Sequence, residues 1–128
     1  FLLIGTNTMH KVAPAIELAV NIPLLHIADA TAEVLVGDGV KTVGLLGTAF
    51  TMEQNFYKGR LTDRYGLSVT VPDRDDRQAV HDIIYGELCQ GIIKASSRQR
   101  YREIVGRLAD AGARAIGGDR LLLRAAAL

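Results

Sequence analysis

The chain has 128 residues, of which 48% are hydrophobic, and its 15 basic and 14 acidic side chains give a formal net charge of +1. This length and apolar content predict one folded domain and exclude a disordered chain. The balanced charge argues against nucleic acid as the main partner. No apolar run approaches the ~20 residues of a membrane-spanning helix, so we expect no membrane partner.

The single cysteine, Cys89, rules out an internal disulfide and favours a reducing compartment, so we expect a cytoplasmic protein. The apolar residues 1–4 lack the positively charged start of a signal peptide. Because the sequence begins inside an apolar run without an initiator methionine, we expect it to be a fragment of a longer chain.

Short apolar runs alternate with segments of helical periodicity. The predicted strands span residues 1–5 (buried), 24–27, 42–46 and 67–71, and a last strand begins at residues 115–116. The predicted helices span residues 9 or 11 to 20, 29 to 37, 51 to 65, 80 to 91 and 96 to 112, followed by a frayed or helical tail at residues 121–128. The predicted helix caps are Asn7 or Thr8, Asp29, Ser96 or Ser97, and a capping box from Thr51 to Gln54. This alternation predicts an α/β fold with a doubly wound parallel sheet, in which residues 67–71 form an edge strand.

Two polar turns stand out at predicted strand ends. Leu-Ile-Gly-Thr ends at Thr6, and Leu-Leu-Gly-Thr ends at Thr48. Open α/β sheets bind ligands at the carboxyl ends of their strands, and the free N–H groups of a following helix can hold an anion. The two turns therefore predict a site that offers hydroxyls and backbone donors to a small carboxylate.

Three segments together resemble a known family. They are Thr-Asn-Thr-Met-His-Lys-Val-Ala at residues 6–13, Pro-Leu-Leu-His-Ile-Ala-Asp at residues 23–29, and Leu-Leu-Gly-Thr-Ala-Phe-Thr-Met-Glu-Gln at residues 45–54. Over residues 1–115 the chain resembles the aspartate/glutamate racemases, most closely their broad-specificity bacterial amino-acid branch. The resemblance implies two similar α/β domains with the substrate between them. Residues 1–30 then correspond to the end of the first domain, residues 31–116 to the second, and residues 117–128 to a divergent tail.

The resemblance also implies the chemistry and the residues. Members of this family racemise aspartate or glutamate without pyridoxal phosphate and without a metal, because two acid–base residues face opposite sides of the substrate Cα. By this resemblance Thr6 is the catalytic residue on one face, and Asn7, Thr8, Thr48 and Thr51 bind the substrate carboxylates. A capping role alone would also explain Thr51. Family members often form homodimers, and an exposed sheet edge could also drive association or aggregation.

The resemblance stops where the family carries its second catalytic segment, Gly-Cys-Thr-Glu. This chain has Gly-Gly-Asp-Arg-Leu at residues 117–121, a pattern that a frameshift or a rearranged gene end would leave. Cys89 does not replace the missing cysteine, because it lies in a helical pattern away from any strand end. We therefore expect little activity from this chain. The alternatives are a non-catalytic remnant or small dicarboxylic amino-acid-binding module, and another family chemistry such as hydantoin or maleate isomerisation.

The remaining polar residues have simpler interpretations. His26 should be a hydrogen-bonded core histidine, His81 should be solvated, and His10 could line the cleft, cap a helix or lie on the surface. The three histidines are too widely spaced to predict a metal site. We expect a solvated charged turn at residues 72–76 and a solvated helix face carrying Arg98, Arg100, Arg102 and Arg107.

Overall fold

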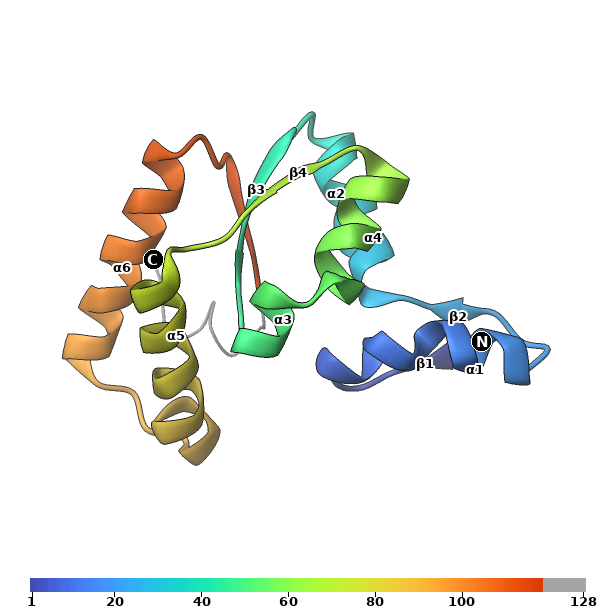
Figure 1. The fold of residues 1–128 in the computed structure, drawn as a ribbon, viewed down its shortest axis with the longest axis horizontal. Helices are drawn as coiled ribbons and strands as arrows, with labels where there is room; N and C mark the ends of the chain where they lie inside the picture. The colour runs from blue at the N-terminus through green and yellow to red at the C-terminus, as the bar shows by residue number, and fades with distance from the viewer. Residues whose placement is uncertain (119–128) are drawn as a thin grey trace.

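The computed structural model describes residues 1–118, which form two small parallel sheets joined by helices (Figure 1). In chain order the elements are β1 (Leu2–Leu3), the 3-10 helix η1 (Thr8–Val12), α1 (Ala13–Ala19), β2 (Leu24–Leu25), α2 (Ile27–Gly37), β3 (Thr42–Leu46), α3 (Ala49–Glu53), α4 (Asn55–Tyr65), β4 (Ser68–Thr70), α5 (Arg74–Gly86), the 3-10 helix η2 (Leu88–Gln90), α6 (Ala95–Asp110) and β5 (Ala115–Gly118). The expected tail at residues 121–128 lies outside the described residues.

The larger sheet has the strand order β4-β3-β5, and all its pairs are parallel. Successive residues of β3 point to opposite faces: Val43 and Leu45 join one core cluster, whereas Leu46 joins the other. A Cβ at Gly44 would lie 2.8 Å from the Ile116 Cδ1 and 3.1 Å from the Leu108 Cδ1, so a side chain there would force these two side chains to shift.

Helices cover both faces of this sheet, with α2 and α4 on one side and α5 and α6 on the other (Figure 1). The α2/α4 side contains the buried residues Ala28, Ala32, Val43, Leu45, Tyr57, Leu61 and Leu67. The α5/α6 side contains Leu46, Met52, Val80, Ile84, Leu88, Tyr101, Ile104, Leu108 and Ala113. The doubly wound α/β fold is therefore confirmed, and β4 lies at an edge of the described sheet as predicted.

The smaller sheet contains only β1 and β2, paired from Leu2 with Leu24 to Leu3 with Leu25. The prediction of a buried strand at residues 1–5 is wrong: the strand has two residues, and the Leu3 side chain is 63% exposed. A two-stranded sheet offers too few neighbours to cover both of its faces, so the apolar pattern alone overestimates burial here.

The first helix caps also differ from the prediction. Neither Asn7 nor Thr8 caps η1 with its side chain; instead the Thr6 hydroxyl accepts a hydrogen bond from the Met9 N–H at 3.4 Å. The helix α2 begins before Asp29, and its cap is His26, whose Nδ1 accepts from the Ala28 N–H at 3.1 Å. An imidazole nitrogen can satisfy a helix amide as a carboxylate does, but cap preferences favour Asp, Ser, Thr and Asn.

The helix expected at residues 51–65 is two helices, because the backbone is extended at Gln54. Thr51 therefore lies inside α3 and forms no capping box. Helix α6 begins one residue before Ser96, and Ser97 donates to a Glu87 carboxylate oxygen at 2.7 Å instead of capping. The partner of Ser97 lies ten positions away, and α3 begins before Thr51, so the local spacing of both residues misleads.

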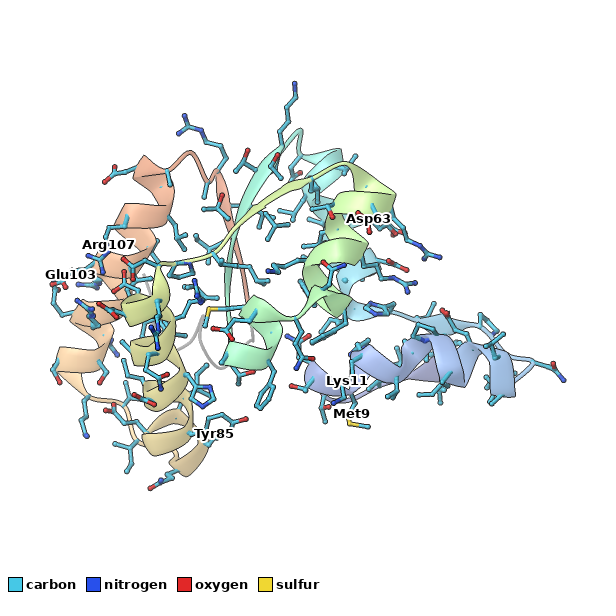
Figure 2. All side chains as sticks on the ribbon, viewed as in Figure 1. Met9, Lys11, Asp63, Tyr85, Glu103 and Arg107 are labelled. Carbon is cyan, nitrogen blue, oxygen red and sulfur yellow. The ribbon has the colours of Figure 1, made fainter. Side chains whose placement is uncertain are left out.

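The prediction of a solvated charged turn is wrong at Asp76, whereas Arg100 and Arg107 of the predicted arginine face have side chains that are 42% and 47% exposed but form ion pairs. Asp76 is 4% exposed, and its two carboxylate oxygens accept from Arg100 at 2.8 Å and from Arg107 at 2.7 Å. Figure 2 shows Arg107 on α6, and its Nη2 lies 2.7 Å from the Asp76 Oδ2 of α5. The ion pairs join α5 to α6, a contact between residues more than 20 positions apart that sequence spacing does not reveal.

Burial of His26 makes the stability of this fold sensitive to acid. Its pKa is lowered from 6.5 to about 4, first because burial disfavours the charged ring, and then because Arg60 and His10 repel that charge. Between these pH values the unfolded chain binds a proton that the folded chain does not, so stability falls as the pH drops from 6.5 to 4. We expect a loss of about 2–3 kcal/mol in urea unfolding over this window.

The matched variant for this measurement is His26→Asn, which keeps a good helix cap and cannot titrate. Its unfolding free energy should change less between pH 6.5 and pH 4 than that of the unaltered chain. An equal change in the two proteins would mean that other groups carry the acid sensitivity.

No helix among residues 1–118 is long and apolar enough to cross a bilayer.

Candidate functional site

A cavity of about 630 Å³ lies at the carboxyl ends of the parallel strands. Its wall includes residues 4–8 after β1, Ile27 after β2, Gly47 and Thr48 after β3, and residues 116–118 at the end of β5. Both sheets therefore point their strand ends into one cavity, which is the position where open α/β sheets bind ligands.

The first polar turn contributes Thr6, Asn7 and Thr8 to the wall, so the structure brings these three predicted residues together. Thr6 is exposed, and its hydroxyl accepts only the long bond from the Met9 N–H. The Asn7 side-chain oxygen is buried and has no hydrogen-bond partner among the described residues. Buried polar atoms without partners are rare, so the Asn7 amide is an incompletely bonded group in this wall.

The second polar turn contributes Thr48 and Thr51 to the same wall. Their hydroxyl oxygens lie 3.4 Å apart, and Thr51 is 2% exposed. A side chain at Gly47 would meet the Thr51 Cβ at 3.0 Å, so the turn packs tightly against α3. All five predicted site residues therefore line one cavity, although their roles in binding and catalysis stay predictions.

Sequence reasoning missed the part of the wall that the helices supply. Thr31 on α2 and Tyr57 on α4 both line the cavity, and the Tyr57 hydroxyl donates to the Thr31 Oγ1 at 3.4 Å. Burial raises the pKa of the Tyr57 hydroxyl, which keeps it a neutral donor. The sequence could have indicated Thr31 as a cavity residue, because residues 25–31 contain a strand, a polar turn and the start of a helix. No local sequence feature indicated Tyr57.

The described wall contains hydroxyl, amide and backbone groups but no charged side chain. A ligand carboxylate there would be held by neutral donors and by the N–H groups that follow the strands. Among residues 1–118, no three His, Cys, Asp or Glu side chains are grouped to hold a metal ion.

Two histidines behind the wall differ from their expected surroundings. His81 is not freely solvated, since its Nδ1 accepts from the Ala49 N–H at 3.1 Å. His10 is 2% exposed, which excludes the surface position, and its Nε2 accepts from the Ile27 N–H at the start of α2, which is a capping role. Neither ring lines the cavity itself.

The only cysteine lies away from this cavity. Cys89 is exposed on η2, whereas the end of β5 presents Gly117 and Gly118 to the cavity. The wall described therefore contains no thiol.

The cavity and the fold define the chain as a parallel α/β protein with a hydroxyl-rich site at its strand ends. The family profile of Asp/Glu/Hydantoin racemases matches residues 1–117, and the chain belongs to this family. It is similar to the crystal structure of a candidate Asp/Glu racemase from Yersinia pestis, with 44% identity and a TM-score of 0.89 over 98% of this chain and 63% of that one.

A second similar structure is an aspartate racemase homologue from Pyrococcus horikoshii. It has 32% identity and a TM-score of 0.82 over 97% of this chain and 54% of that chain. The chain thus spans less than two thirds of the length of both relatives. The expected membership of this family is confirmed.

Proposed function

We propose that the cavity is the amino-acid site of a racemase-type enzyme and that this chain supplies one of its two acid–base groups. The observation that carries the proposal is the meeting of Thr6, Asn7, Thr8, Thr48 and Thr51 in one cavity at the strand ends. The substrate would be aspartate or glutamate, with its carboxylates held by Asn7 and the threonine hydroxyls.

In this proposal Thr6 exchanges a proton with one face of the substrate Cα. Inversion needs a second group on the opposite face, because a single base returns the proton to the side from which it came. A threonine hydroxyl does not titrate in the ordinary range, so Thr6 is a better proton donor than base. The chain alone should therefore turn over slowly.

The test is solvent-deuterium incorporation at the Cα of L-aspartate and L-glutamate, followed by NMR. It detects proton removal even where inversion fails. Any exchange above the uncatalysed rate should be lost in Thr6→Ala, whereas Thr6→Ser, which keeps the hydroxyl, should retain most of it. Equal exchange rates in Thr6→Ala and the unaltered chain would reject Thr6 as the acid–base group.

A second candidate function is a binding module for small dicarboxylic amino acids that does no chemistry. The position of Cys89 outside the cavity favours it, since the wall formed by residues 1–118 then contains no group that forms an anion readily. Saturable binding of aspartate without deuterium exchange would support this function over racemisation. The division of the chain at residue 30 into parts of two family domains stays a prediction.

A further inference from the structure

The start of α2 is held by two imidazole rings. The first helical amides have no partner within their own helix, so something else must bond them. The Ile27 N–H donates to the Nε2 of His10 at 3.3 Å, and the next amide donates to His26. Because Ile27 lies in the cavity wall, His10 fixes the wall where it passes from β2 into α2.

The other side of the same His10 ring holds the first polar turn. Its Nδ1 lies 2.8 Å from the Thr6 carbonyl oxygen and 3.2 Å from the Asn7 carbonyl oxygen. A carbonyl only accepts, so the Nδ1 must carry the proton, and the Nε2 is left free to accept from Ile27. One neutral ring thus links the Thr6 turn to the start of α2.

His81 holds the second polar turn in a similar way, but it accepts a backbone hydrogen bond through Nδ1, whereas His10 accepts one through Nε2. Its Nδ1 accepts from the Ala49 N–H, the amide directly after Thr48. The ring contacts the rings of Phe50 and Tyr85, with centroid distances of 6.4 Å and 4.8 Å. Figure 2 shows Tyr85 on the side of α5 that faces α3. An amide only donates, so this Nδ1 is unprotonated and the proton of the neutral ring is on Nε2.

We propose that His10 and His81 are positioning residues that hold the two polar turns of the cavity through opposite neutral tautomers. Neither ring touches the cavity; each acts through the backbone of a turn that carries predicted substrate-binding hydroxyls. A shift of about 1 Å in such a turn is enough to misplace groups that must meet a reacting atom. Only the expected effect of these residues on substrate binding rests on the proposed function. The tautomers of the two rings do not depend on any ligand.

The first experiment measures the tautomers by long-range ¹H–¹⁵N NMR of the imidazole rings at pH 7.5. We expect His10 to carry its proton on Nδ1 and His81 to carry it on Nε2. The same tautomer in both rings, or a doubly protonated ring in either, would overturn the proposal. This readout needs no substitution, so misfolding of a variant does not affect it.

The second experiment compares His81→Asn with His81→Leu. Asparagine places an acceptor oxygen close to the position of the imidazole Nδ1, whereas leucine fills a similar volume without an acceptor. Hydrogen exchange of the Ala49 amide should be about tenfold faster in His81→Leu and close to the original rate in His81→Asn. Equal protection of Ala49 in all three proteins would overturn the role of His81.

Aspartate titrations on the same three proteins then separate this inference from the proposed function. We expect affinity to fall about tenfold in His81→Leu and to recover in His81→Asn. If the unaltered chain binds no aspartate or glutamate, the proposed function fails, while the tautomers and the Ala49 exchange still decide the positioning role. Binding that is equal in His81→Leu and His81→Asn would contradict the effect on substrate.

Discussion

Gly118→Cys is expected to raise the rate of Cα deuterium exchange by about a hundredfold or more. Gly118 lies at the end of β5, paired with Leu46 and lining the cavity that also contains Thr6. A cysteine thiol titrates near ~8.5, so a useful fraction is thiolate at mildly alkaline pH, and a well-placed general base contributes about 10²–10⁴-fold. The new thiol would supply a base that is absent from the part of the wall formed by residues 1–118.

The controls separate the chemistry of sulfur from its size. Gly118→Ser adds a similar side chain without an accessible anion and should give no increase in exchange. Cys89→Ser, combined with Gly118→Cys, should keep the increase, because Cys89 is exposed on η2 and does not line the cavity. If Gly118→Cys and Gly118→Ser bind aspartate equally and exchange at the same rate, the cavity does not carry a two-base reaction.

The elements that could be predicted from sequence are those whose signal is local. The apolar run at residues 42–46 forms β3, α2 ends at Gly37 as predicted, and the polar turns at Thr6 and Thr48 lie at strand ends. The two turns follow β1 and β3, which lie in separate sheets, so strand direction alone did not predict one shared cavity. That prediction came from the resemblance to a family whose substrate lies between two domains.

The features that could not be predicted depend on partners from distant segments. The hydroxyl of Tyr57 meets Thr31 only because α4 packs beside α2, and no spacing rule links these residues. His81 was predicted to be solvated, yet its partner is the Ala49 amide from another helix. Charged residues misled in the same way, since Asp76 looks solvated until α6 brings two arginines to it.

We expect the second large effect, a loss of stability, on substitution of Asp29. This residue joins α2, which carries Thr31, to α4, which carries Tyr57. Its carboxylate accepts from the Arg60 Nε and Nη2, each at 2.6 Å, which is a two-pronged geometry. The Arg60 side chain is 12% exposed and that of Asp29 is 21% exposed. The hydrogen bond from the Arg60 guanidinium lowers the pKa of Asp29 below its usual range, so the pair stays charged at neutral pH.

Asp29→Asn should therefore lower the free energy of unfolding by about 2–4 kcal/mol in urea at pH 7, because it leaves a largely buried guanidinium without its carboxylate. The matched control on the same helix is Glu33→Gln, an exposed position that should change stability by less than about 0.5 kcal/mol. Removing the charge of Arg60 as well, in Asp29→Asn with Arg60→Met, should recover part of the loss, since no unpaired ion remains. A loss in Asp29→Asn no larger than that in Glu33→Gln would mean that Arg60 finds solvent or Glu17, 3.8 Å away, at no cost, and that α2 and α4 are held together by their apolar contacts alone.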